Sequence, residues 1–188
     1  MLPGMIAHCP QVVHVAAATQ QSTYAVVTLT SCDTRVAGPW RARVGVNGLS
    51  AHHREGDGTT PLGSYRIGPV IYGVGGNPGV KLRYHRLTCG DWWDEDPSSP
   101  TYNEFRHVAC GTTPAFGGGS EALWRATVAY RYFAVLEFNT ARVPGRGSAM
   151  FLHVDNGHAT NGCVSLPQPQ LVRTLRWLRA GATIRVTA

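Results

Sequence analysis

The chain has 188 residues and a net charge of +6, with 43% hydrophobic and 15% charged residues. Such a composition is typical of a folded globular protein and excludes a disordered or fibrous chain. A chain of this length buries about two-thirds of its unfolded surface, so folding does not require disulfides, and we expect one domain over residues 1–188. The longest weakly polar stretch, residues 12–18, is too short to cross a bilayer, so no membrane insertion is expected.

The excess of basic residues fits an anionic partner, such as a polyanionic cell wall or a nucleic acid. All of the 17 basic residues except Lys81 are arginine, and they are scattered along the chain. This scatter argues against a dedicated nucleic-acid surface. Arg173, Arg176 and Arg179 lie at helical spacing and predict one solvated helix face.

Alternation of β-branched and polar residues dominates the pattern and predicts a mainly β fold. The predicted strands are residues 11–17, 24–30, 40–46, 64–71, 131–138, 150–154 and 183–187. Two helices are predicted, a short one after Ser120 and a longer one over residues 168–179. In the longer one Pro169 lies in the first turn, three leucines share one face, and Gly181 follows the end.

Residues 73–119 show little regular periodicity and are expected to form a long functional loop. The loop contains the sequence Asp-Trp-Trp-Asp-Glu-Asp, with Trp92 and Trp93 at its centre. The two aromatic rings are expected either to cover a sugar or peptide substrate, with a neighbouring carboxylate meeting a substrate amine, or to anchor the loop to the core. The stretch lacks the glycine and bidentate glutamate of an EF-hand calcium loop.

The five cysteines are an odd number, and none forms a C-x-x-C pair. In an oxidising compartment, sequence order favours pairing Cys9 with Cys32 and Cys89 with Cys110, which leaves Cys163 as a free thiol; other pairings are open. The alternative is five reduced thiols in a cytosolic protein. No segment is typical of a signal peptide, which is expected either of a cytosolic protein or of a chain whose export signal is missing.

The strongest candidate site lies where a predicted strand ends at His153 and a polar turn then presents Gly162 and Cys163. An imidazole beside a thiol favours the thiolate, which is the nucleophile, and the amides of Gly162 and Cys163 are placed to bind an oxyanion. His158 and Asn161 lie in the same turn, where they either contact a substrate or simply form the turn. His52 and His53 lack a spaced third ligand, so no metal site is predicted, and no cofactor is expected.

These residues resemble the signature of the L,D-transpeptidase (YkuD-type) catalytic domain family. Thr160-Asn161-Gly162-Cys163-Val164 matches the nucleophile turn, and His153 matches the strand-borne base. Residues 56–65, which contain Thr-Pro-Leu-Gly and end at Tyr65, match a second motif of the family. The likeness runs from about Arg41 to Ala188. It indicates a divergent branch, because Val154 follows the histidine where the family usually has glycine, and the interval from histidine to cysteine is short.

The resemblance implies a β-sandwich or barrel with one C-terminal helix and a long active-site loop. It implies that Cys163 attacks a peptidoglycan tetrapeptide stem, expels D-Ala and passes the acyl group to an amine of a second stem, giving a 3-3 cross-link. A backbone carbonyl is expected to orient His153, with Asp155 as the side-chain alternative. The remaining substrate-contacting residues are expected to be Tyr65, His158, Asn161 and Ser165, with Trp92 and Trp93.

The function expected from the resemblance is therefore a monomeric, extracytoplasmic cysteine acyltransferase that carbapenems acylate, with peptidoglycan stem peptides as partners and no nucleic acid. Water as the acceptor would make it an L,D-carboxypeptidase. Two other classes remain open: a non-catalytic wall-binding module of the same fold, and a cytosolic thiol hydrolase or redox sensor.

Overall fold

The computed structural model describes residues 9–188 and shows a mainly β protein, with 40% strand and 9% helix. Its main sheet has the order β11-β12-β13-β3-β2-β1-β14-β6-β7. Since β11 also pairs with β6, the first eight strands in this order form a closed barrel, and β7 lies outside it. The strands of the main sheet are β1 Gln11–Ala17, β2 Tyr24–Ser31, β3 Thr34–Arg43, β6 Gly63–Gly73, β7 Arg83–Arg86, β11 Phe133–Leu136, β12 Phe151–Val154, β13 Val164–Leu166 and β14 Thr183–Thr187.

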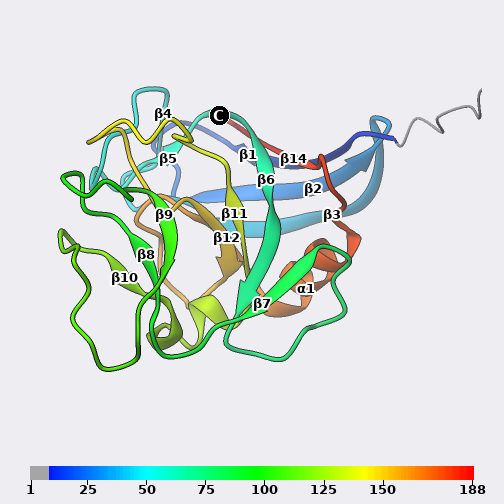
Figure 1. Ribbon diagram of the computed structural model, residues 1–188. Helices are drawn as coiled ribbons and strands as arrows, with labels where there is room; N and C mark the ends of the chain where they lie inside the picture. The colour runs from blue at the N-terminus through cyan, green and yellow to red at the C-terminus, as the bar shows by residue number, and fades with distance from the viewer. Residues whose placement is uncertain (1–8) are drawn as a thin grey trace, which may run out of the picture.

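A second, three-stranded sheet of order β10-β8-β9 lies to one side of the barrel (Figure 1). Its strands are β8 Asp91–Asp94, β9 Glu104–His107 and β10 Glu121–Ala122. A small parallel pair is formed by β4 Leu49–Ser50 and β5 Thr60–Pro61. Two 3-10 helices, η1 Leu123–Arg125 and η2 Ala129–Arg131, follow β10 and lead the chain back into the barrel at β11.

The barrel interior is filled by alternate residues of its strands, because side chains of a strand point in turn to opposite faces. Val13 and Val15 of β1 are fully buried there, as is Leu152 of β12. The helix α1, Gln168–Trp177, adds Leu171 and Leu175 to the same core.

A second apolar cluster joins the barrel to the small sheet. Phe133 and Phe151, whose ring centroids lie 4.6 Å apart, contribute from β11 and β12, and Trp93 of β8 packs edge-on against Phe151 at 5.0 Å. Burial of such large aromatic side chains fixes the small sheet against the outer face of β12. His153 lies two residues after Phe151 and therefore faces the same side.

The predicted strands 11–17 and 183–187 are confirmed in full, and those at 24–30, 64–71, 131–138 and 150–154 agree to within two residues at each end. The predicted strand 40–46 was wrong in its extent, because β3 covers Thr34–Arg43. The chain leaves the sheet after Arg43, where the amides of Gly45 and Val46 donate to Thr60 Oγ1 (2.8 Å) and the Thr160 carbonyl (2.7 Å) instead.

Two expectations about the middle of the chain were wrong. Residues 73–119 are not a structureless loop, since they contain β7, β8 and β9, whose four-residue length is too short to show a period. The helix predicted after Ser120 is absent from this segment, because Glu121 and Ala122 pair with Trp93 and Trp92 as β10. The 3-10 helices η1 and η2 follow instead of an α-helix, and the Ser120 hydroxyl donates to the Gly117 carbonyl at 2.6 Å rather than capping a helix.

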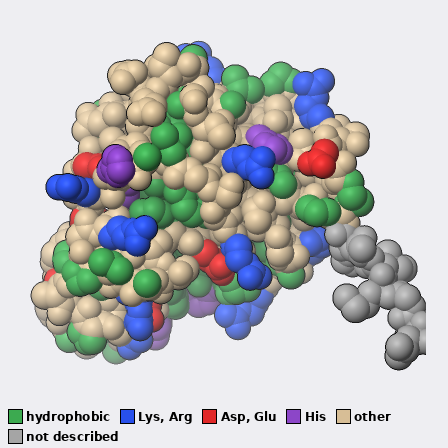
Figure 2. All heavy atoms as spheres, turned by 90° about the horizontal axis from the view of Figure 1, so that it is seen from above, with side chains coloured by type: hydrophobic (Ala, Val, Ile, Leu, Met, Phe, Trp, Pro, Cys, Tyr) green, Lys and Arg blue, Asp and Glu red, His purple; other side chains and the backbone are tan. Residues whose placement is uncertain are grey.

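The helix predicted over 168–179 is confirmed, although it ends at Trp177. Arg173 and Arg176 are exposed on it, as expected of a solvated face, whereas Arg179 lies beyond the end and donates to the Trp177 carbonyl at 2.6 Å. Figure 2 shows lysine and arginine side chains scattered over the face seen from above.

All five cysteines lie in the described part of the chain, and both predicted disulfides are confirmed. Cys9 pairs with Cys32 and Cys89 pairs with Cys110, which leaves Cys163 as the free thiol. This pairing contradicts the alternative of five reduced thiols. Within residues 9–188, no helix has the length and hydropathy that a membrane span requires.

Candidate active site

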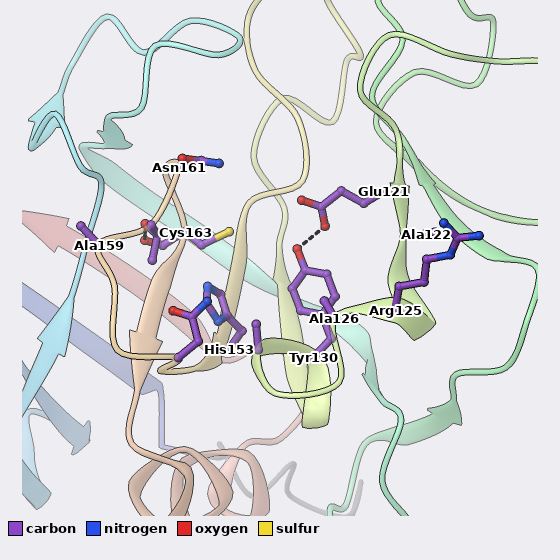
Figure 3. Close-up of a pocket in the computed structure, with 12 residues that line it drawn as sticks. Glu121, Ala122, Arg125, Ala126, Tyr130, His153, Ala159, Asn161 and Cys163 are labelled. Carbon is purple, nitrogen blue, oxygen red and sulfur yellow. Dashed lines mark hydrogen bonds between the residues drawn. The ribbon is translucent and has the colours of Figure 1, made fainter.

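The candidate site lies where the outer face of the barrel meets the small sheet. His153 is on β12, and Cys163 precedes β13, the strand that runs parallel to β12. The two strands are hydrogen-bonded, with Leu152 opposite Val164, so residues 153 and 163 project on the side of the sheet away from the barrel core. Figure 3 shows the Cys163 sulfur and the His153 ring pointing into the same pocket.

His153 is almost completely buried and is oriented by the backbone. Its Nδ1 lies 2.8 Å from the Val154 carbonyl oxygen, which can only accept a hydrogen bond, so Nδ1 carries the proton and Nε2 keeps a free lone pair. Burial lowers the pKa of His153 below its usual value, so the ring is neutral at neutral pH. Asp155, the side-chain alternative for the orienting group, instead pairs with Arg43 at 3.3 Å.

The Cys163 thiol is held between two backbone groups of the preceding strand region. Its sulfur accepts from the Phe151 amide at 3.3 Å and donates to the Ala149 carbonyl at 3.2 Å. Burial, followed by the negative charge of Glu121, raises the pKa of Cys163 above its usual value. The resting pair is therefore a thiol beside a neutral imidazole, not the thiolate expected from the sequence.

A cavity of about 520 Å³ opens on this pair (Figure 3). Besides Cys163 and His153, it is lined by Tyr130, Glu121 and Asn161. The Tyr130 hydroxyl donates to Glu121, and the Tyr130 ring packs edge-on against the His153 ring at 5.9 Å. The wall opposite the barrel is thus built by β10 and the 3-10 helices.

Both sequence motifs meet at the nucleophile turn. The Thr60 hydroxyl donates to the Cys163 carbonyl at 3.3 Å, and the Thr160 hydroxyl donates to the same oxygen at 2.6 Å. Gly162 adopts φ +138°, and a Cβ there would lie 2.9 Å from the Thr59 carbonyl oxygen. Glycine is therefore required at this position by the close approach of the upstream motif.

Of the two amides predicted to bind an oxyanion, that of Gly162 donates to Thr160 Oγ1 at 3.2 Å. Its participation would require this bond to be exchanged for one to a substrate. Asn161 is exposed and lines the cavity, as expected of a substrate-contacting residue. His158 is exposed in the turn and does not line the cavity.

Four predicted substrate contacts are not brought to this cavity. Ser165 is fully buried beside His153 in the β12–β13 ladder, so its hydroxyl cannot reach a substrate. Tyr65 lies in a different cavity and donates to the Leu62 carbonyl at 2.6 Å. Trp93 is buried in the second apolar cluster, and Trp92 packs edge-on against Trp124 at 5.3 Å. The two tryptophans thus anchor this segment by packing, which was the alternative to covering a substrate.

Three glutamates near Cys163 were not singled out as site residues from the sequence. Glu55, Glu95 and Glu121 line a cavity of about 370 Å³ that also contains Cys163. Glu95 lies in the acidic and aromatic stretch, where a carboxylate was expected to meet a substrate amine. No sequence signal marks Glu55 or Glu121, because each is brought there by long-range pairing of short strands and turns.

The other carboxylates of the acidic and aromatic stretch have structural partners. Asp91 accepts from His85 at 2.9 Å and from His107 at 2.7 Å, and Asp94 accepts from the Thr101 hydroxyl at 2.7 Å. His53 contacts Asp57 at 3.0 Å. Over residues 9–188, no group of three or more His, Cys, Asp or Glu side chains is arranged to hold a metal ion.

The fold and the site define a class of protein, a β-barrel that holds a free thiol and a backbone-oriented imidazole in one cavity. The chain belongs to the L,D-transpeptidase catalytic domain family, whose YkuD model matches residues 10–186. The match starts well before Arg41, where the motif-based resemblance began, because β1 and β2 are integral strands of the barrel.

Among solved structures, the chain is similar to a crystal structure of Mycobacterium tuberculosis L,D-transpeptidase 1. The identity is 11%, the TM-score is 0.42, and the alignment covers 96% of this chain and 63% of that one. The chain thus spans less than two-thirds of the length of that protein. No curated protein sequence matches the chain.

Proposed function

We propose that this protein is a peptidoglycan L,D-transpeptidase that uses Cys163 as nucleophile and His153 as general base. The observation that carries the proposal is the pairing, in one cavity, of the free Cys163 thiol with a neutral His153 whose Nδ1 is bound to the Val154 carbonyl. Family membership indicates the reaction class.

In the first half-reaction, the sulfur attacks the carbonyl carbon that precedes the terminal D-Ala of a tetrapeptide stem. The S–C bond forms while Nε2 of His153 takes the thiol proton, and the C–N bond then breaks as that proton passes to the leaving D-Ala amine. The product is a thioester on Cys163. Because the thiol is protonated at rest, the proton transfer and the attack have to be coupled.

In the second half-reaction, a side-chain amine of another stem attacks the thioester carbon. The new N–C bond forms, the C–S bond breaks, and the proton lost by the amine returns to sulfur through His153. The result is a 3-3 cross-link. With water as the acceptor the same steps would give L,D-carboxypeptidase activity. The three glutamates beside Cys163 favour an amine over water as the acceptor, since they provide acceptors for its ammonium form and a glutamate carboxylate can take the proton that this form loses before the free amine attacks.

The two disulfides support an extracytoplasmic location, where such bonds persist. We further propose that residues 1–188 form a single catalytic domain that acts as a monomer, of which residues 1–8 lie outside the described part. Light scattering of the purified protein at working concentration tests the monomer, and a stable dimer would contradict it.

The function is tested with purified disaccharide tetrapeptides. The wild-type protein should release D-Ala and form tetrapeptide–tripeptide dimers, whereas Cys163→Ala should form neither. His153→Ala should lower the rate by about 10²–10⁴-fold, as loss of a general base does. The matched control is His158→Ala, an exposed histidine of the same turn. A folded wild-type protein that releases no D-Ala would leave the non-catalytic wall-binding module as the better description.

Carbapenem acylation gives an independent test. Intact mass should show one covalent adduct on the wild-type protein and none on Cys163→Ala. An adduct that persists in Cys163→Ala would reject this residue as the nucleophile.

A further inference from the structure

The cavity lined by the three glutamates is acidic, although the protein as a whole is basic. It has a volume of about 370 Å³, and Glu55, Glu95 and Glu121 line it without any lysine or arginine. They come from three separate segments: the turn before β5, the residue after β8, and β10. Cys163 lines both this cavity and the larger one that holds His153.

The three carboxylates are satisfied only in part. Glu55 accepts from the Tyr102 hydroxyl and from Ser148 Oγ at 2.8 Å, and Glu121 accepts from the Tyr130 hydroxyl. Glu95 Oε1 is shielded from solvent and has no hydrogen-bond partner in the described part of the chain. Within residues 9–188, none of the three forms an ion pair.

A second buried polar atom in the same wall also lacks a partner. The His53 side chain is 2% exposed and lines the cavity, and its Nε2 makes no hydrogen bond within the described residues. Its Nδ1 lies 3.0 Å from the Asp57 carboxylate, an acceptor, so in the neutral ring Nδ1 carries the proton and Nε2 is an acceptor. A Cβ at Gly147 would lie 2.5 Å from Nε2, so only glycine fits beside this edge of the ring.

Unpartnered buried carboxylates are costly, and protonation reduces the cost. Burial, together with the charges of Glu121 and Glu55, raises the pKa of Glu95 to about 9, so Glu95 is protonated at neutral pH. A cation in the cavity would lower the pKa of Glu95 again, because a nearby positive charge favours the ionised carboxylate. The unpartnered atoms are a carboxyl oxygen of Glu95 and Nε2 of His53, and no set of ligands for a metal ion is present within residues 9–188.

We propose that this cavity is the binding site for the primary ammonium group of the acyl acceptor, and that Glu95 and Glu121 hold that group beside Cys163. The proposal rests on the proposed function and names the residues that select an amine over water. An ammonium group has three N–H donors, which match the acceptors that face this space. Its positive charge also offsets the repulsion that Glu121 exerts on a Cys163 thiolate, so an occupied cavity favours ionisation of the sulfur.

The test measures binding in the absence of turnover. The full chain with Cys163→Ala is titrated with Nα-acetyl-L-lysine amide, which carries a primary ammonium, and with Nα-acetyl-L-norleucine amide, which has a similar chain without it. Calorimetry in two buffers of different ionisation enthalpy should show that the lysine compound binds with release of a proton from Glu95. The norleucine compound should not bind at the same concentrations.

Glu95→Gln and Glu121→Gln, each combined with Cys163→Ala, should weaken binding of the lysine compound at least ten-fold, since each removes a charged acceptor. Glu104→Gln, at a half-buried glutamate of β9 that pairs with Arg142 and does not line the cavity, is the matched control and should bind normally. Near-UV circular dichroism verifies that each variant is folded. Equal binding of the two compounds, or lysine binding unchanged in both glutamine variants, would overturn the proposal.

Different results would contradict the proposed transpeptidase function and the proposed acceptor site. If Cys163→Ala binds the ammonium compound but the wild-type protein releases no D-Ala, the acceptor site stands and the transpeptidase assignment is lost. If the wild-type protein forms dimers but both glutamine variants bind and transfer to amines normally, the reaction stands and this cavity is not the acceptor site.

Discussion

The side chain of Thr60 donates a hydrogen bond to the carbonyl oxygen of Cys163, a residue 103 positions later in the chain. Thr60 is completely buried, and its oxygen also accepts from the Gly45 amide at 2.8 Å. One hydroxyl therefore links the chain that leaves β3, the upstream Thr-Pro motif and the turn that carries the thiol. This explains why the two motifs occur together in one sequence.

Thr60→Val keeps the shape of this side chain and removes both bonds. Loss of a buried hydrogen bond that leaves its partner unsatisfied costs about 1–3 kcal/mol. We expect a loss of unfolding free energy in this range in urea, and slower carbapenem acylation because the Cys163 backbone is less well fixed. Thr112→Val is the control, since its hydroxyl makes an exposed bond to the Ala109 carbonyl. Equal effects of the two substitutions would show that Thr60 has no special role in the turn.

The pH dependence of acylation follows from the directions of the two pKa shifts. His153 acts as a base only when it is neutral, and burial lowers its pKa below the usual value of about 6.5. The neutral form therefore persists as the pH falls through 6.5, and the acylation rate should decline only at lower pH. Stopped samples analysed by intact mass between pH 4.5 and pH 8 give this profile. A midpoint above pH 7 would indicate a base other than a buried, neutral His153.

Asp91 provides a separate test of stability. Burial alone would raise its pKa, but the Thr88 amide and the side chains of His107 and His85 outweigh this and lower it. A carboxylate with a lowered pKa stabilises the folded state above its unfolded pKa, about 3.9, and this contribution is lost as the pH falls through the folded value. The melting temperature of Asp91→Asn should be lower than that of the wild type at pH 6, and the difference should shrink below about pH 4.

The control for that comparison is Asp33→Asn, at an exposed turn position. A difference between Asp91→Asn and the wild type that stays constant down to pH 2 would assign the effect to packing rather than to the charge of Asp91.

The two disulfides close loops of similar length, with sequence separations of 23 and 21 residues. Loss of either should cost about 3 kcal/mol of unfolding free energy. They differ in position, because the loop between Cys89 and Cys110 contains β8, β9 and Glu95. Replacing Cys89 and Cys110 by serine should therefore also impair amine transfer, whereas replacing Cys9 and Cys32 should affect stability alone. Denaturant titration and the tetrapeptide assay separate the two effects.

The barrel was largely predictable from sequence because its strands carry strong alternation. Val13 and Val15 fix the pattern of β1. The small sheet was not predictable, since β8 and β9 have four residues each and are held by side chains such as Asp91 that accept hydrogen bonds from distant histidines. No local pattern records such a partner.

In the candidate site, too, only the residues that belong to a local sequence motif were predictable. Cys163, His153 and the turn between them form a local motif. The odd number of cysteines and their order in the chain predicted the free thiol. Glu121 and Tyr130 carry no motif, because their roles depend on how β10 folds against β8. The protonated resting state of Cys163 was also missed, since burial and distant carboxylates raise its pKa, and neither is visible from neighbouring residues.

The group that orients His153 is the main-chain carbonyl of Val154. Every amino acid supplies that oxygen, so no point substitution at residue 154 can delete it. The side chain at this position is instead constrained by packing, because it is buried in the barrel interior. This explains how valine can follow His153 where the resemblance led us to expect glycine. Only a change in the path of the chain, such as an inserted or deleted residue in β12, would turn the ring away from the sulfur.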